Sequence, residues 1–149
     1  MEVVGGVEGK VEGVVEGEEA KEPIAIGHIA LTAPSPLAVH HRDTPIALGI
    51  AATYRGKGYG REAIEWALDY AFAMLGMHRV SIGYSAWNEG AGRLYARMGF
   101  VEEERRRQAR WFRGRWWDSV GLGMLEEEWR ERRKKEGRGF DEGGMLLLE

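Results

Sequence analysis

The fold is decided by residues 46–60, which read Ile46-Ala47-Leu48-Gly49-Ile50-Ala51-Ala52-Thr53-Tyr54-Arg55-Gly56-Lys57-Gly58-Tyr59-Gly60. The stretch opens as a continuous apolar run, which is typical of a central strand covered on both faces. Apolar residues then recur at helical spacing up to a stop at Gly76, at Ile64, Ala67, Leu68, Ala71 and Leu75. The sequence therefore predicts a strand, a glycine-rich loop and a helix in immediate succession.

A glycine-rich loop at the start of a helix suits phosphate, because unpaired amides and the helix dipole both favour an anion there. The three glycines of residues 56–60 let the backbone approach an anion closely, and Arg55 and Lys57 add positive charge. An ordinary tight turn is the alternative. Arg61-Glu62 stands where the Walker motif needs Lys-Ser or Lys-Thr, and the glycine spacing misses the dinucleotide fingerprint.

The rest of the chain reads as one domain with two flanking segments. Residues 1–22, rich in Gly, Glu and Val, predict an edge strand or a disordered arm, and residues 130–149 predict a charged, mobile tail. Between them, residues 23–129 form the predicted domain. Outside the central stretch it contains strands at 24–31 and 80–85, a helix at 89–98, and two strands around Arg113-Gly114-Arg115.

Composition excludes several classes of protein. The 149 residues are 44% apolar and 30% charged, with no apolar run long enough for a membrane helix and no secretory leader visible at the start. The absence of cysteine excludes disulfides, thiolate metal sites and a cysteine nucleophile. A formal charge of −3 argues against a general nucleic-acid binder. We expect a cytoplasmic protein with no membrane or nucleic-acid partner.

Two segments together resemble the GNAT superfamily of N-acetyltransferases. Arg55–Gly60 is similar to the coenzyme A motif [Q/R]-x-x-G-x-[G/A], and Asn88–Phe100 is similar to N-x-x-A-x-x-L-Y-x-x-x-G-F. Trp117–Val120, followed by Leu125 and Glu128-Trp129, resembles the closing strand of the RimJ/RimL-like branch. The likeness covers roughly residues 24–129. It implies an α/β (α+β) fold with a mostly antiparallel mixed sheet, splayed between the fourth and fifth strands of the family, and helices on both faces.

The resemblance also implies acetyl-CoA as co-substrate and a set of residues that bind it. The amides of residues 56–60 would hold the pyrophosphate, with Arg55 beside it. The freed edge of the strand would pair with pantetheine, and an N–H near Ile50 or Ala51 would stabilise the oxyanion. Asn88 would contact pantetheine. The implied coenzyme residues are Ile50, Ala51, Ala52, Arg55, Gly56, Lys57, Gly58, Tyr59, Gly60 and Asn88.

For catalysis, Tyr95 matches the family tyrosine that protonates the departing thiolate, although its spacing also fits a core aromatic. Asp118 is the acidic candidate, either as a catalytic group or as a residue that orders the site. His28 is the other candidate for a base, although a core or edge role fits a lone histidine in an apolar strand better. His40, His41 and Asp43 would form a metal or acid–base cluster, but a solvated loop fits them better, so we predict no metal.

The acceptor is open, because no pair of amphipathic helices precedes Pro23, where this branch carries one wall of the acceptor site. Candidates are a protein N-terminus, a polyamine or another small amine. The alternative is a non-catalytic acyl-CoA-binding or scaffold protein, and a nucleic-acid adaptor fits a net acidic chain poorly. An aromatic cluster would line an acceptor pocket, or complete the core and a homodimer contact. It consists of Trp111, Phe112, Trp116 and Trp117.

Overall fold

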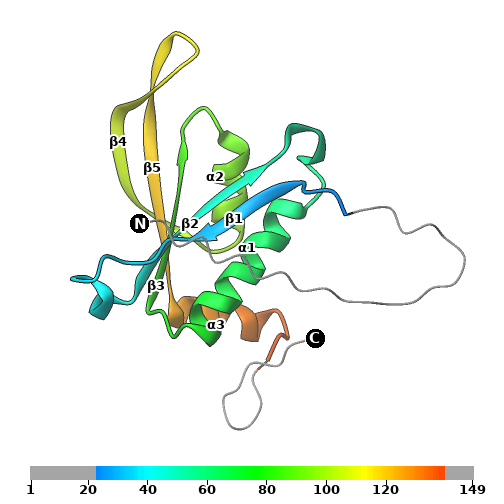
Figure 1. Ribbon diagram of the computed structural model, residues 1–149, viewed down its shortest axis with the longest axis vertical. Helices are drawn as coiled ribbons and strands as arrows, with labels where there is room; N and C mark the ends of the chain where they lie inside the picture. Colours follow the sequence, from blue (N-terminus) through cyan, green and yellow to red (C-terminus); the bar gives the residue numbers. More distant parts are fainter. Residues whose placement is uncertain (1–22, 140–149) are drawn as a thin grey trace, which may run out of the picture.

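A computed structural model describes residues 23–139, which form a five-stranded sheet with helices against it (Figure 1). In chain order the strands and helices are β1 (Gly27–Leu31), β2 (Asp43–Ile50), α1 (Tyr59–Asp69), β3 (Arg79–Ser85), α2 (Glu89–Arg97), β4 (Val101–Phe112), β5 (Arg115–Leu125) and α3 (Glu126–Lys135). Short turns occupy Val39–His41 and Ala52–Tyr54, and a π-helical turn, Tyr70–Met74, extends α1. No helix of residues 23–139 is long and apolar enough to cross a membrane.

The sheet has the order β1-β2-β3-β5-β4. Within the described residues only β2 and β3 run parallel, and the other neighbouring pairs are antiparallel. Parallel neighbours need a crossover, which α1 supplies between β2 and β3. The predicted mixed, mostly antiparallel sheet is confirmed.

The two parallel strands separate partway along their length, as predicted. They pair from Asp43↔Arg79 to Ile46↔Ile82, but β2 continues to Ile50 and β3 to Ser85 without pairing with each other. The end of β2 stays with β1 through Gly27↔Ile50, while the end of β3 stays with β5 through Ser85↔Ser119. Each strand follows its other neighbour, and the twist of the sheet draws the two ends apart.

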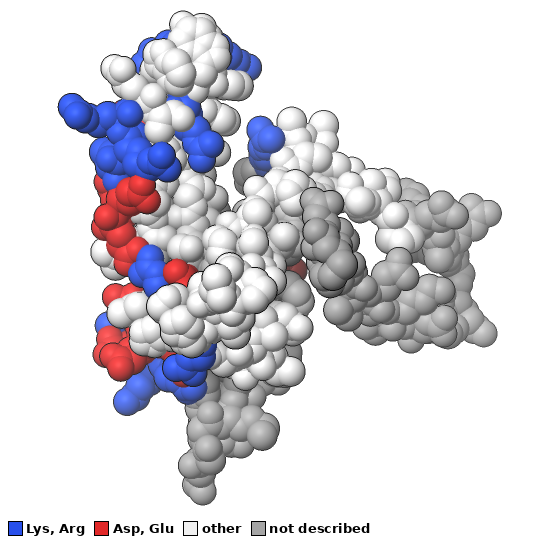
Figure 2. Space-filling view, turned by 60° about the vertical axis from the view of Figure 1, so that its left-hand side comes forward, with Lys and Arg blue, Asp and Glu red and all other residues white. Residues whose placement is uncertain are grey.

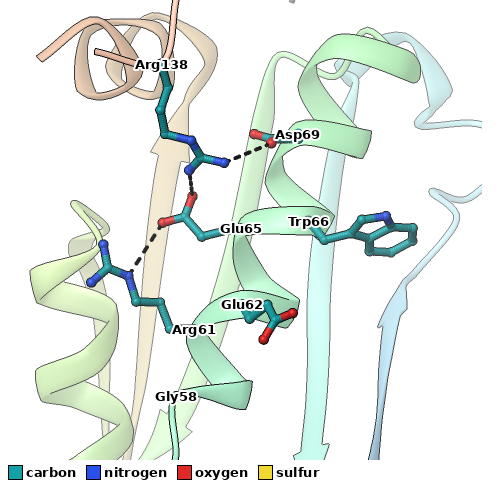
Figure 3. A pocket seen from close by; sticks show the side chains of 7 residues that line it. All are labelled: Gly58, Arg61, Glu62, Glu65, Trp66, Asp69 and Arg138. Atoms are coloured by element: carbon teal, nitrogen blue, oxygen red, sulfur yellow. Dashed lines mark hydrogen bonds and ion pairs between the residues drawn. The ribbon is translucent and has the colours of Figure 1, made fainter. Parts of the chain in front are cut away.

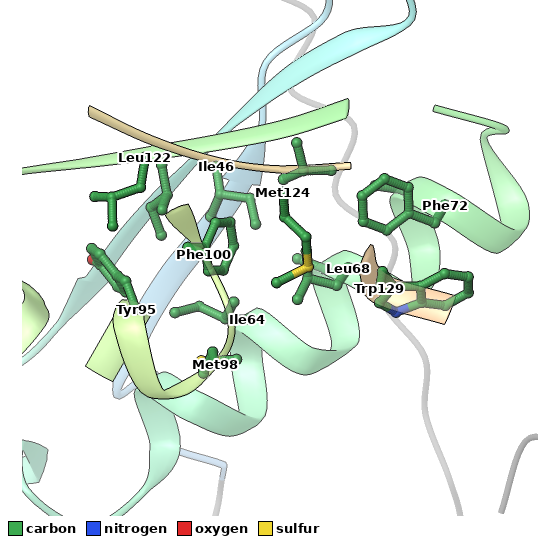
Figure 4. Packing of buried hydrophobic residues seen from close by; sticks show 14 of the residues in the cluster. Ile46, Ile64, Leu68, Phe72, Tyr95, Met98, Phe100, Leu122, Met124 and Trp129 are labelled. Carbon is green, nitrogen blue, oxygen red and sulfur yellow. The ribbon is translucent and has the colours of Figure 1, made fainter. Parts of the chain in front are cut away.

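One hydrophobic core lies between the sheet and the three described helices (Figure 4). Its fully buried members include Ile64 and Leu68 of α1, Val80 of β3, Met124 of β5 and Trp129 of α3. The prediction placed helices on both faces of the sheet, and the helices of residues 23–139 all pack on the same face. The opposite face of the sheet carries small residues in its middle, such as Ala47, Gly49, Ser81 and Gly83, and the longer side chains of His28 and Arg79 lie over Gly49 and Gly123.

Helix α3 corrects the prediction of a mobile tail from residue 130. Arg133 is only 1% exposed and donates to Asp69 Oδ1 at 2.6 Å, while Arg132 makes two bonds of 2.6 Å with the Glu65 carboxylate. Trp129 Nε1 also donates to Asp69, at 3.2 Å. Buried charges need such partners, so the basic run packs on α1 as part of the fold. Residues 1–22 and 140–149, for which an arm and a tail were predicted, lie outside the described residues.

The hairpin between β4 and β5 turns where the sequence predicted. Arg113 and Gly114 have φ of 49° and 77°, the pair of positive values that a type I′ turn requires. Strand β1 begins three residues later than predicted, and β2 begins earlier, at Asp43.

We predict that Asp69→Ala lowers the free energy of unfolding by about 3–5 kcal/mol, because Arg133 would keep a buried charge without its partner. Urea denaturation measures the change. The matched control is Glu89→Ala, which removes an exposed pair with Arg93 and should cost less than about 1 kcal/mol. Equal effects of the two substitutions would contradict the structural role of the buried pair.

Candidate active site

The glycine loop presents an open surface in front of α1. Gly56 and Gly58 have φ of 75° and 92°, in the left-handed region that favours glycine, and Gly58 caps the helix. A Cβ atom at either position would meet nothing within 4 Å among the described residues. The amides of residues 56–61 donate to no acceptor in the described part, whereas Glu62 N–H already bonds Gly58 at 3.1 Å. This arrangement suits an anion.

Arg55 and Lys57 flank the loop on exposed positions. Arg55 Nε donates to the Ile50 carbonyl at 2.8 Å, so its side chain ties the loop to the end of β2. Lys57 Nζ lies 5.5 Å from the centre of the Tyr54 ring. The structure thus gives Arg55 a bond within the protein in addition to the charge that the sequence assigned to it.

The end of β2 narrows the candidates for the oxyanion donor. Ala51 N–H donates to Ile26 at 2.9 Å, and the Ala51 carbonyl accepts from Tyr54 at 2.9 Å. Of the two residues that the sequence offered for this amide, Ile50 or Ala51, Ala51 is therefore already bonded within the protein. Successive residues of a strand direct their amides to opposite edges, so the Ile50 amide faces the splayed side. Ala52 belongs to the following turn, where its carbonyl accepts from Arg55 N–H at 3.3 Å.

Gly60 brings the loop together with two other predicted segments. A Cβ atom there would lie 3.7 Å from Leu48 Cδ2 of β2 and 3.8 Å from Leu94 Cδ2 of α2. Leu94 directly precedes Tyr95. The first turn of α1, the end of β2 and the middle of α2 therefore converge next to the splay.

Tyr95 is a core residue, only 7% exposed, whose ring contacts Tyr84 edge-on at 6.1 Å and Phe100 at 6.2 Å. Burial raises the pKa of its hydroxyl above the usual value of 10.0. The group therefore keeps its proton at neutral pH. No side chain or backbone group of residues 23–139 forms a hydrogen bond with it, so the hydroxyl is free to donate to a ligand.

Asn88 and Asp118 both hold backbone in place. Asn88 is the N-cap of α2, where its Oδ1 accepts from Ala91 N–H at 3.2 Å. Asp118 Oδ1 accepts from Gln108 N–H at 3.0 Å, at a left-handed position (φ 50°) inside the irregular part of β4. This contact favours the ordering role for Asp118 over the catalytic one.

His28 does not form one cluster with the neighbouring His40 and His41. The His28 ring lies over Gly49 on the sheet face away from the helices. His40 and His41 have ring centres 4.0 Å apart, but Asp43 is paired with Arg79 at 3.4 Å. Among residues 23–139, no three His, Asp or Glu side chains are placed to hold a metal ion.

Sequence reasoning missed a depression of about 480 Å³ on the outer side of α1 (Figure 3). It begins at Gly58 and is lined by Gly58, Arg61, Glu62, Glu65, Trp66, Asp69 and Arg138. Burial alone would raise the pKa of Glu65, but the hydrogen bond and charge of Arg132, with Arg138 and Arg61, bring it below its usual value. The signal in the sequence was Glu65 and Asp69, four residues apart and matched by the later arginines.

The aromatic cluster lies at the exposed end of the β4–β5 hairpin. Its members therefore do not belong to the core, which was one of the predicted alternatives. Trp111 and Trp116 are 60% and 54% exposed and meet at 5.2 Å between ring centres. Phe112 stacks on Trp87 at 4.5 Å, and Trp117 Nε1 donates to the Phe112 carbonyl. An acceptor pocket and a homodimer contact stay as the two predictions for these side chains.

Comparison with known proteins adds an independent finding. A match to the acetyltransferase (GNAT) family spans residues 4–100. The spermidine N(1)-acetyltransferase of Vibrio cholerae is 33% identical over 92 residues, which are 62% of this chain and 53% of that protein. The putative ribosomal N-acetyltransferase YdaF of Bacillus subtilis is 33% identical over 60% of this chain and 49% of its own. The chain thus spans about half the length of these curated relatives.

Solved structures agree with the fold. The spermidine/spermine N-acetyltransferase SpeG from Vibrio cholerae, crystallised with manganese ions, matches with a TM-score of 0.65 and 31% identity. The match covers 72% of this chain and 61% of that one. A dodecameric structure of the Vibrio cholerae spermidine N-acetyltransferase matches with the same TM-score and identity.

We predict that Gly58→Ala weakens binding of acetyl-CoA about tenfold or more, because a Cβ at φ 92° strains the loop and stands in front of its amides. Isothermal titration calorimetry measures the affinity. Gly114→Ala is the matched control, since φ there is 77° and the space is also open, but the residue lies at the far hairpin turn. Both substitutions should lower stability similarly, and only Gly58→Ala should affect binding.

Proposed function

Because the chain belongs to the acetyltransferase (GNAT) family, we propose that it transfers the acetyl group of acetyl-CoA to a primary amine. One observation carries the proposal: an open glycine loop at the start of α1 stands beside the splayed end of β2. The first feature offers amides to a pyrophosphate, and the second offers an unpaired strand edge to an extended ligand.

Acetyl-CoA, the acetyl donor, would occupy the glycine loop and the splayed end of β2 at once. Amides of residues 56–60 would hold the pyrophosphate, with Arg55 and Lys57 adding charge, and pantetheine would run along the Ile50 side of β2. In this pose Asn88 contacts the arm from the start of α2, on the other side of the splay. Ala51 has no free backbone group to contribute, and Ala52 would contribute only through its place in the turn.

In the proposed reaction the neutral amine attacks the thioester carbonyl carbon directly. The C–N bond forms, the C–S bond breaks, and its electron pair leaves with sulfur. The Ile50 N–H would stabilise the negative charge on the carbonyl oxygen. The Tyr95 hydroxyl would give its proton to the thiolate, and the proton lost by the amine would pass to solvent and restore Tyr95. Asp118 would act by ordering β4 through Gln108.

Among acceptors, a polyamine is our first choice, because relatives in Vibrio cholerae and Escherichia coli are named spermidine N(1)-acetyltransferases. A protein N-terminus is the second choice, because the relative YdaF is named a putative ribosomal N-acetyltransferase. With this acceptor we also propose the RimJ/RimL-like branch. We further propose that residues 23–139, with α3 included, form the domain, and that the protein assembles with itself, as the dodecameric relative does. A cytoplasmic location stays a prediction.

Two measurements on the full chain test this proposal. Titration with acetyl-CoA should show saturable binding, and a thiol-release assay should then give turnover with spermidine or with N-terminal peptides. Binding without thiol release from any amine would favour the alternative, a non-catalytic acyl-CoA-binding protein. If acetyl-CoA does not bind at all, neither an acetyltransferase nor an acyl-CoA-binding protein is the correct proposal for this chain.

For Tyr95→Phe we predict a fall in kcat of about 10²-fold with little change in acetyl-CoA affinity, because the ring stays in the core and only the proton donor is lost. Because burial raises the pKa of Tyr95, wild-type kcat should fall only above pH 10, where the hydroxyl loses its proton. The variant should lack this decline. Equal kcat values for the two proteins across the pH range would remove Tyr95 from the mechanism.

A further inference from the structure

Strand β4 forms one edge of the sheet, and all twelve of its residues are exposed. One side of the strand pairs with β5, while no described strand pairs with the other side. An exposed edge of this length is a ready template for another strand. Most proteins protect such edges, and charged side chains are one common means.

The charges on β4 are sorted by sign along the strand. Glu102-Glu103-Glu104 is followed directly by Arg105-Arg106-Arg107, with Arg110 further on. Figure 2 shows this side of the molecule, where basic side chains gather toward the hairpin tip and acidic side chains form a band below them. A strand with this pattern is complementary to itself when it is turned end to end.

We propose that β4 is the contact through which two copies of this chain pair, antiparallel and related by a two-fold axis near residues 104 and 105. In that arrangement the acidic half of each strand faces the basic half of the other. A parallel arrangement would place like charges together, so the charge pattern selects the antiparallel one. The inference does not depend on the proposed acetyl transfer.

Charges within one copy leave this complementarity only partly satisfied. Glu102 meets Arg105 at 2.9 Å and Glu104 meets Arg106 at 3.4 Å, but these side chains are 44–69% exposed, so the pairs exchange readily. Glu103 is held by Arg79. Among residues 23–139, Arg107 and Arg110 have no acidic partner, and a second molecule placed antiparallel along β4 would supply one.

Apolar side chains on the same hairpin add area to this contact. Val101, at the start of β4, is 51% exposed, and Trp111 near its end is 60% exposed. The register of β4 against β5 shifts between Glu102 and Glu104 and again between Arg106 and Arg110. These irregularities shorten the regular part of the edge, so side-chain contacts must supplement the backbone pairing.

Charge reversal in each half tests the contact, with the full chain examined by sedimentation velocity over a range of concentrations. We expect the wild type to dimerise. The acidic-half variant, Glu102→Arg with Glu104→Arg, and the basic-half variant, Arg106→Glu with Arg107→Glu, should each raise the dimer dissociation constant at least tenfold, by about 1.4 kcal/mol. An equimolar mixture of the two variants should dimerise again, because the reversed acidic half of one variant then faces the reversed basic half of the other, and their charges are opposite.

The control is Lys134→Glu with Lys135→Glu, which changes the net charge as the basic-half variant does, but on exposed positions of α3. It should leave the dimer intact. Circular dichroism establishes that each variant is folded. If one is not, salt on the wild type decides: raising it from about 0.05 M to about 0.5 M should weaken the dimer. A monomeric wild type, a dimer indifferent to salt, or folded variants that fail to recombine would overturn the proposal.

Discussion

The separation of β2 from β3 is the constraint on which the rest of the site depends. Pairing ends at Ile46↔Ile82 because the last residues of β2 stay with β1 and those of β3 stay with β5. Among residues 23–139 the Ile50 amide has no strand partner, and α1 and α2 both begin beside the gap. An extended ligand bound here would take the place of the missing strand, and the sheet would set the direction in which it runs.

The position of the glycine loop depends in turn on how α1 is held. Its inner face packs on the sheet through Ile64 and Leu68, and its other side is fixed by Glu65 and Asp69, which pair with Arg132 and Arg133. These ion pairs connect the last described helix to the helix whose first turn carries the loop. The loop takes its shape from the left-handed Gly56 and Gly58, and its position from the helix that these ion pairs hold.

Much of this arrangement was predictable from sequence, because it rests on local patterns. The apolar run, the glycine spacing and the helical period of residues 64–75 gave the strand, loop and helix, and Arg113-Gly114 gave the hairpin turn. Long-range pairing was not predictable. Nothing local shows that Arg133 meets Asp69, 64 residues away, or that the Ala51 amide is taken by Ile26. The exposure of Trp111 and Trp116 likewise follows from how far β4 and β5 extend beyond the sheet.

The sheet face away from the helices is separate from the residues proposed to bind acetyl-CoA. Everything proposed for the donor lies on residues 50–60 and 88–95, supported by the core on one side, while the residues at Ala47, Gly49, Ser81 and Gly83 offer almost no side chain on the other. Among the described residues this face packs against no helix, so changes on it leave the core on the other face in place. Under the proposed function, a substitution on this face would change recognition of the amine and leave the residues proposed for acetyl-CoA in place.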